Sequence, residues 1–123
     1  MHSQIQGFND YFRTKTTENA LQVLFLYKEI KGTEEIRILG KQLLRSATSV
    51  AANFRSACRV RSASEHFAKM CIVVEECDET LFWLEIIEQN GWVQSKRMIS
   101  CIEETKKLLM ALAKARKNLK PPQ

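Results

Sequence analysis

The chain has 123 residues, of which 45% are hydrophobic and 27% are charged, and its formal net charge is +5. This length and composition indicate one globular domain with a sizeable core and exclude the low-hydrophobicity range of disordered chains. No apolar run approaches the roughly 20 residues that a membrane span requires, and no apolar signal-peptide core is found. We therefore expect a cytoplasmic protein without a membrane partner.

The spacing of apolar residues predicts an all-α protein. Only four glycines and two prolines occur, and both prolines, Pro121 and Pro122, stand at the C-terminal end, so little interrupts a helix. Apolar residues recur every three or four positions along most of the chain. The predicted helices cover residues 17–30, 34–57, 62–89 and 94–119. Four helices with short connections favour an up-down-up-down antiparallel four-helix bundle that forms a single domain over 1–123.

Short sequence signals mark the predicted helix ends. Thr33 precedes two acidic residues and is the expected N-cap of the second helix. Ser62 and Glu65 form a capping-box pattern, in which the serine hydroxyl accepts from the Glu65 amide and the Glu65 carboxylate reaches back. Asn90-Gly91 is typical of a left-handed C-cap. An earlier start of the first helix, near Phe8 or Phe12, is an alternative.

Two helices carry apolar patterns that predict which of their residues face the core and which face outward. The predicted core face of the first helix consists of Leu21, Leu24, Tyr27 and Ile30, widened by Ala20, Val23 and Leu26. In the third helix, the residues outside the main seam are Ile72, Trp83, Ile86 and Ile87. Such extra apolar surface indicates a second partner surface. Small residues fill the second half of 34–57, which fits close helix packing either within the bundle or between subunits.

Charge is segregated among the predicted helices. Residues 34–61 carry a net charge of +4 and residues 94–123 carry +6, whereas residues 62–93 carry −6. Pairing of oppositely charged neighbouring helices explains part of this pattern, with about 0–1 kcal/mol per exposed pair. This pairing does not neutralise all of the positive charge, so we expect the surplus of lysines and arginines to face solvent.

Clustered lysines and arginines are typical of surfaces that bind nucleic-acid backbone through counterion release. No zinc finger or RRM aromatic pair accompanies them, so we expect salt-sensitive binding with little sequence specificity. The predicted nucleic-acid-binding residues are Arg45, Arg55, Arg59, Arg61, Lys114, Arg116, Lys117 and Lys120.

Patterns for catalysis, metals and cofactors are missing from the sequence. Neither His2 nor His66 has a glutamate three residues before it, which disfavours a di-iron centre, and His66 is expected at the surface. There is no P-loop or dinucleotide-binding glycine pattern. The four cysteines fall at irregular spacings and are expected to be reduced and mostly buried. We expect no enzyme activity, no cofactor, no metal and no small-molecule substrate.

Three stretches carry a resemblance to a known family. They are Leu43-Leu44-Arg45-Ser46-Ala47-Thr48-Ser49-Val50-Ala51-Ala52-Asn53, Ser62-x-x-Glu65-x-Phe67 and Gly91-Trp92. In this order and spacing the chain resembles the bacterial four-helix bundle proteins encoded in intervening sequences of 23S rRNA genes. That family includes the accessory variability determinant of diversity-generating retroelements. The chain departs from the family pattern at Ala51, where proline is usual, and at Arg55-Ser56-Ala57, where Ala-Glu-Gly is usual.

The resemblance implies a cytoplasmic homo-oligomer, typically a pentamer of bundles, with a positively charged surface. Members from retroelements bind nucleic acid and a reverse transcriptase. Our hypothesis is therefore a non-enzymatic, homopentameric bundle that binds RNA or DNA, as an rRNA intervening-sequence protein or as an accessory to a reverse transcriptase. The alternative is a protein-interaction scaffold whose basic surface meets an acidic partner.

Overall fold

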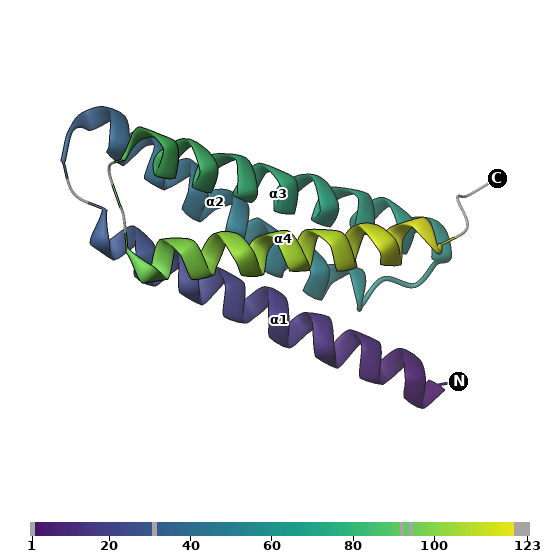
Figure 1. The fold of residues 1–123 in the computed structure, drawn as a ribbon. Helices are drawn as coiled ribbons and strands as arrows, with labels where there is room; N and C mark the ends of the chain where they lie inside the picture. The colour runs from purple at the N-terminus through teal and green to yellow at the C-terminus, as the bar shows by residue number, and fades with distance from the viewer. Residues whose placement is uncertain (1, 31, 92, 94, 120–123) are drawn as a thin grey trace.

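The computed structural model describes residues 2–30, 32–91, 93 and 95–119, and this part of the chain is helical without a strand. The helices are α1 (His2–Glu29), α2 (Glu34–Ala57), α3 (Ala63–Asn90) and α4 (Lys96–Lys117). Each helix packs against the next along the chain, and α1 also packs against α4, which closes the bundle. Figure 1 shows neighbouring helices running in opposite directions. The predicted antiparallel four-helix bundle is confirmed.

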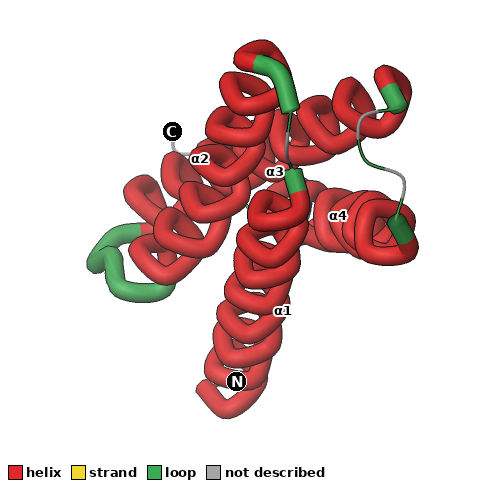
Figure 2. Tube along the Cα trace, turned by 90° about the vertical axis from the view of Figure 1, so that its left-hand side faces the viewer, coloured by secondary structure: helices red, strands yellow, loops and turns green. Residues whose placement is uncertain are grey.

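Helix α1 begins at His2, well before the predicted start at residue 17 and also before the alternative start near Phe8. In Figures 1 and 2, its N-terminal part diverges from α4. Aromatic contacts hold this part to the end of α2, since the rings of Phe12 and Phe54 lie 5.8 Å apart and those of Phe8 and Phe54 lie 6.4 Å apart. Ile5, Phe8 and Phe12 are spaced as in a helix, so this signal could have predicted the early start.

The helix ends follow most of the predicted signals. The Ser62 hydroxyl accepts a hydrogen bond from the Glu65 amide at 3.1 Å, and Gly91 adopts a left-handed φ of 78° at the end of α3. Thr33 is the N-cap of α2, but its hydroxyl makes no capping hydrogen bond. The acidic residues Glu34 and Glu35 in the first turn are left to stabilise the positive end of α2.

The core consists of two apolar clusters, one in each half of the bundle. The first fills the half that contains the end of α1 and the start of α2, with Leu26, Leu43 and Ile87 among its fully buried members. The second fills the half next to the α2–α3 connection and includes Phe54 and Met70. Each cluster receives side chains from all four helices. Burial of such side chains contributes about 1.5–3 kcal/mol each.

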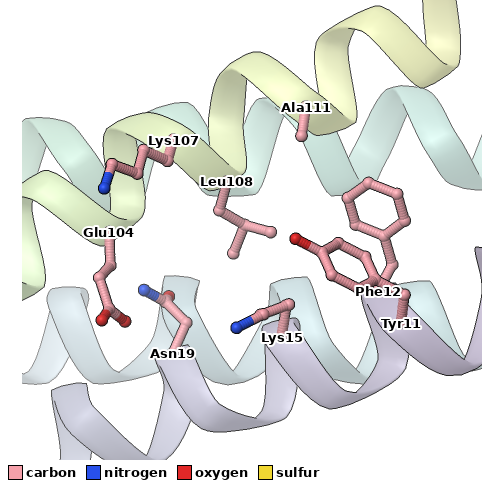
Figure 3. A pocket seen from close by; sticks show the side chains of 8 residues that line it. All are labelled: Tyr11, Phe12, Lys15, Asn19, Glu104, Lys107, Leu108 and Ala111. Carbon is pink, nitrogen blue, oxygen red and sulfur yellow. The ribbon is translucent and has the colours of Figure 1, made fainter.

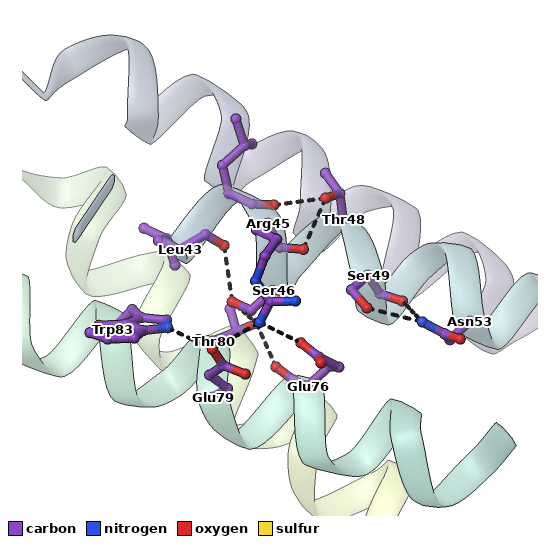
Figure 4. A network of polar contacts seen from close by, with 11 residues as sticks. Leu43, Arg45, Ser46, Thr48, Ser49, Asn53, Glu76, Glu79, Thr80 and Trp83 are labelled. Atoms are coloured by element: carbon purple, nitrogen blue, oxygen red, sulfur yellow. Dashed lines mark hydrogen bonds and ion pairs between the residues drawn. The ribbon is translucent and has the colours of Figure 1, made fainter. Parts of the chain in front are cut away.

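A buried polar layer separates the two apolar clusters. Across the α1–α4 contact, the Asn19 side-chain amide donates to the Thr105 hydroxyl at 3.0 Å. Across the α2–α3 contact, the Thr80 and Ser46 hydroxyl oxygens lie 2.9 Å apart (Figure 4). All four side chains are at most 2% exposed. Each pair can form only when its two helices are aligned at the same level, so the layer sets the helix register.

The core face of α1 is only partly the predicted one. Val23 and Leu26 are buried as predicted, but Leu21 is 48% exposed, and the buried residues also include Phe12, Thr16 and Asn19. Placing Leu21 inside was wrong because two of the inward-facing positions are polar, so that the apolar repeat that includes Leu21 was the clearer signal. The two polar residues form hydrogen bonds inside the bundle. Thr16 donates to the Arg13 carbonyl, and Asn19 donates to Thr105.

The outward face of α3 is only partly as predicted. Ile72 is 38% exposed, and Trp83 and Ile86 are half-buried, but Ile87 is fully buried and belongs to the core. The exposed aromatic residue of this helix is Phe82, at 50% exposure. Assigning Ile87 to the outside was wrong because Ile87 continues the buried series Cys77, Thr80 and Leu84, in which the polar Thr80 hides the apolar repeat.

We predict that Thr80→Val lowers the free energy of unfolding by about 0.5–1.5 kcal/mol, because the Ser46 hydroxyl loses its partner across the α2–α3 contact. Urea unfolding measures the effect. Thr48→Val is the matched control, since the Thr48 hydroxyl is exposed and bonds only to carbonyls of its own helix. An equal loss in both variants would contradict a role for the buried pair.

Candidate nucleic-acid interface

The antiparallel arrangement brings most of the predicted nucleic-acid-binding residues to one end of the bundle. Arg55 lies in the last turn of α2, and Arg59 and Arg61 lie in the α2–α3 connection. The last turn of α4 contributes Lys114, Arg116 and Lys117. Figure 1 shows that the end of α4 and the α2–α3 connection lie at the same end. Two clusters that are far apart in sequence therefore form one basic end.

The two halves of the bundle differ in charge. The half that contains the basic end comprises residues 2–15, 46–76 and 107–119, with ten lysines and arginines against four acidic residues. Among the described residues of the other half, seven are basic and ten are acidic. The bundle is thus strongly polarised along its axis, and the positive excess belongs to one half.

None of the six residues at the basic end pairs with a carboxylate in the described part of the chain. The ion pairs found there are Arg13–Asp10, Lys15–Glu18, Arg45–Glu76, Arg45–Glu79 and Arg97–Glu29. All six residues of the basic end are at least partly exposed. Their charges therefore face solvent without internal neutralisation.

Arg45 is placed differently from the other predicted residues. It lies in the middle of α2, where its Nη2 atom is 3.2 Å from a Glu76 carboxylate oxygen and 2.9 Å from one of Glu79 (Figure 4). The Trp83 indole N–H donates to the same Glu79 oxygen at 3.1 Å. These contacts balance the Arg45 charge within the bundle and join α2 to α3, away from the basic end.

An open cleft lies within the basic end. Its volume is about 570 Å³, and its lining includes Ile5 and Phe8 of α1, Arg61 of the α2–α3 connection, His66 of α3 and Leu119 after α4. Arg61 and Leu119 therefore border the same cleft, although they lie at the ends of different helices. The cleft lining combines apolar side chains with one cationic residue, Arg61.

His66 has a structural role that the sequence analysis did not predict. It is half-buried, and its Nδ1 atom lies 2.8 Å from the Ala57 carbonyl oxygen. Because a carbonyl can only accept, Nδ1 carries the proton. The contact ties the first turns of α3 to the last residue of α2 and fixes the connection that carries Arg59 and Arg61.

Basic residues at the basic end also serve the fold. Arg55 and Lys114 to Lys117 occupy the last turns of α2 and α4, where positive charge offsets the negative end of the helix dipole by about 0.3–1 kcal/mol each. This role accounts for positive charge at a helix end. It does not account for Arg59 and Arg61, which lie beyond the end of α2.

The basic half includes lysines and arginines that sequence reasoning did not select. They are Arg13, Lys15, Lys69 and Lys107. Each lies inside a helix, where the linear sequence gives no loop or cluster signal. Only the helix directions place them in the same half as Arg59. Lys120, Trp92, Gln94 and the two prolines, on which other predictions fell, lie outside the described residues.

The cysteines are free thiols. Burial raises the pKa of Cys77 to about 12 and that of Cys101 to about 11, so both are protonated at neutral pH. Cys58 and Cys71 are half-buried, which corrects the expectation that the cysteines are mostly buried. Over the described ranges, no three histidine, cysteine or acidic residues group as metal ligands would. Nor does any helix there have the length and hydropathy of a membrane span.

The fold and the basic end define a class of small, basic four-helix bundle proteins. Within this class, the chain belongs to the 23S rRNA-intervening sequence protein family, which it matches over residues 12–114. It is also similar to a crystal structure from Bacteroides thetaiotaomicron, described as a protein with unknown function from the S23 ribosomal protein family. The sequences are 27% identical, the TM-score is 0.79, and the match covers 87% of this chain and 99% of that one. No curated protein matches the chain.

We predict a pH-dependent contribution from Glu79. Hydrogen bonds from Trp83 and Arg45 hold the pKa of Glu79 below its ordinary value. A carboxylate with a lowered folded-state pKa adds stability above its unfolded pKa of about 4.3 and loses it as the pH falls through the folded-state pKa. Glu79→Gln should therefore lower the unfolding free energy at pH 7 by less than about 1 kcal/mol.

At a pH that protonates the carboxylate in both states, Glu79→Gln should match the wild type in urea unfolding. Glu88→Gln is the control, because Glu88 is an exposed residue of the same helix without an ion pair in the described chain. A difference between Glu79→Gln and wild type that does not change with pH would rule out the charged contact as its source.

Proposed function

We propose that this protein binds the phosphate backbone of RNA or DNA through the basic end of the bundle. The observation that supports the proposal is the group of six basic side chains, from Arg55 to Arg61 and from Lys114 to Lys117, none of which pairs with a described carboxylate. Phosphates that replace water and counterions at such a surface gain affinity mainly from ion release. Binding of this kind depends strongly on salt and weakly on sequence.

The family supports two cellular settings for this activity. Its name supports a protein associated with an intervening sequence of 23S rRNA, and the resemblance to retroelement accessory proteins supports the alternative of a reverse-transcriptase accessory. In either setting, a nucleic acid would be available to bind the basic end. The genes that flank the coding sequence distinguish the two settings. A surrounding 23S rRNA gene would support the first setting, and a neighbouring reverse-transcriptase gene would support the second.

We also propose that the bundle assembles into a homo-oligomer, with the pentamer as the expected form. Two outward surfaces support a head-to-tail contact. One is the apolar groove of about 510 Å³ between α1 and α2, which is lined by Leu21, Leu24 and Leu44, with Lys41 at its edge. The other is the outward face of α3 around Phe82.

The two surfaces complement each other in polarity and charge. Phe82 is 50% exposed, and the α3 face around it carries Glu75, Asp78 and Glu85. An aromatic side chain with acidic neighbours suits an apolar groove with a basic edge. Because the two surfaces differ, repeated contacts would be heterologous, and a rotation of one fifth of a turn per contact would close them into a pentameric ring.

We predict that Arg59→Glu/Lys117→Glu weakens binding to a labelled RNA at low salt. The slope of log affinity against log salt should also fall, by about 0.7–0.9 for each lost phosphate contact. Fluorescence anisotropy over a salt series measures both quantities. The double variant removes one cationic residue from each of the two clusters at the basic end.

The matched control is Arg37→Glu/Lys96→Glu, which makes the same change in net charge at exposed positions in the other half. Thermal melts of both variants check that lost helix-end charge has not unfolded the protein. If the wild type and Arg59→Glu/Lys117→Glu bind the labelled RNA with equal affinity, the proposed function is contradicted. Partners captured by the protein that survive nuclease treatment would favour the scaffold alternative.

We predict that Phe82→Asp and Leu21→Asp each lower the mass of the assembly in light scattering. Each places a charge in a surface that the proposed contact buries. Met110→Asp is the control, since Met110 is 73% exposed on α4 and outside both surfaces. A wild-type protein that is monomeric at all concentrations, or a loss of mass in all three variants, would contradict the proposed contact.

A further inference from the structure

A cavity of about 210 Å³ lies between α1 and α4 and runs from the middle of the bundle toward the basic end (Figure 3). The residues that line it are Tyr11, Phe12, Lys15, Asn19, Glu104, Lys107, Leu108 and Ala111. Its volume is below the roughly 300–1,000 Å³ of pockets for drug-sized ligands. It therefore suits a single ring system.

One end of the cavity has an aromatic wall. Tyr11 is 56% exposed, and its ring packs edge-on against the buried ring of Phe12, with 5.1 Å between the centroids. The contact with Phe12 restrains a ring that is open to solvent. Exposed aromatic rings of this kind hold unstacked bases, because every base offers a π face for stacking.

Two lysines line the cavity from different helices. Lys15 of α1 has a single contact with Glu18, at 3.8 Å, and its ammonium group lies 5.8 Å from the centroid of the Tyr11 ring. Lys107 of α4 is exposed and pairs with no carboxylate in the described chain. Lys15 is therefore close to any phosphate attached to a ring that stacks on Tyr11, and Lys107 adds a second positive charge to the cavity lining.

The inner end of the cavity presents hydrogen-bond acceptors. Asn19 is 2% exposed and donates through Nδ2 to Thr105, while its Oδ1 atom has no partner in the described structure. The Glu104 carboxylate lies next to Asn19 in Figure 3. An unpartnered buried acceptor is uncommon. The exposed Glu104 carboxylate is the acceptor open to the N–H groups of a base, and a base bound to it would lie against the Asn19 side chain.

We propose that this cavity holds one unstacked nucleotide of a single-stranded segment, with the base against Tyr11, the phosphate near Lys15 and Lys107, and the N–H edge toward Asn19 and Glu104. The inference rests on the proposed function and deepens it. A base that is paired in a duplex cannot enter the cavity, so the site adds a preference for single strands to the charge-driven binding of the basic end.

The test compares a short labelled single-stranded RNA with the duplex of the same sequence in fluorescence anisotropy. Tyr11→Ala should weaken single-strand binding at least about fivefold, the lower end of the loss expected for one base–aromatic contact, and should leave duplex binding unchanged. Tyr11→Phe keeps the stacking ring and should bind as the wild type does. Lys107→Ala, on the other wall, should also weaken single-strand binding.

Phe25→Ala is the matched control, because Phe25 is 46% exposed on the same helix and outside the cavity. Equal losses for Tyr11→Ala on single strand and duplex, or an equal loss for Phe25→Ala, would overturn the inference. Tight binding of free guanosine monophosphate that needs Tyr11, with no effect of Tyr11→Ala on the strand, would overturn it in favour of a free nucleotide.

The inference and the proposed function fail in different ways. If Arg59→Glu/Lys117→Glu weakens binding while Tyr11→Ala does not, the basic end remains the binding surface and the cavity is not a nucleotide site. If the wild-type protein binds neither strand, the proposed function itself fails. Thermal melts of Tyr11→Ala and Lys107→Ala, both at exposed positions, confirm that each variant is folded.

Discussion

The antiparallel alignment of four helices at one level is the constraint on which the rest of the structure depends. Apolar packing alone tolerates sliding of one helix along another, because leucines and isoleucines at successive turns are interchangeable partners. The buried pairs Asn19–Thr105 and Ser46–Thr80 are not interchangeable, since a shift of one turn would break both hydrogen bonds between helices and leave the buried Asn19 amide without its partner. The polar layer thereby decides which side chains share each end of the bundle.

Charge polarity along the bundle is a consequence of this alignment. The net charge of α3 is −2 over residues 63–76 and −4 over residues 77–90, and the net charge of α4 is +1 over residues 96–106 and +4 over residues 107–117. Because α3 and α4 run in opposite directions, these biases reinforce each other, and Arg59 and Arg61 add positive charge at the same end. Arg45 shows the opposite case, since it lies where α2 passes the acidic centre of α3 and is bound by Glu76 and Glu79.

The same alignment links the proposed functions of the molecule. The basic end and the cavity between α1 and α4 are adjacent, because the divergence of α1 opens the cavity in the half that carries the positive excess. A strand held by charge at the basic end would reach Tyr11 along the bundle. The surfaces around Leu21 and Phe82 lie on the sides, so assembly and nucleic-acid binding would use separate faces.

Much of the fold could be predicted from the sequence, because it rests on local chemistry. Few glycines and prolines, helical apolar spacing, the Ser62 cap and the Gly91 turn determined four helices and the ends of most of them. The basic clusters could be named for the same reason, since net charge is a property of composition. The resemblance added the family, which the match over residues 12–114 confirmed.

Only the tertiary structure decided which faces are inside and which charges are free. Asn19 points inward with a hydrogen-bond partner on α4, Thr105, which no local pattern reports, while Thr16 bonds to the Arg13 carbonyl of its own helix and Leu21 faces outward. In the same way, only the tertiary structure shows that Arg45 is paired with Glu76 and Glu79, whereas Arg59 pairs with no carboxylate in the described chain. The physical reason is that burial and neutralisation depend on contacts between residues distant in sequence, whereas helix formation depends on neighbours within one or two turns.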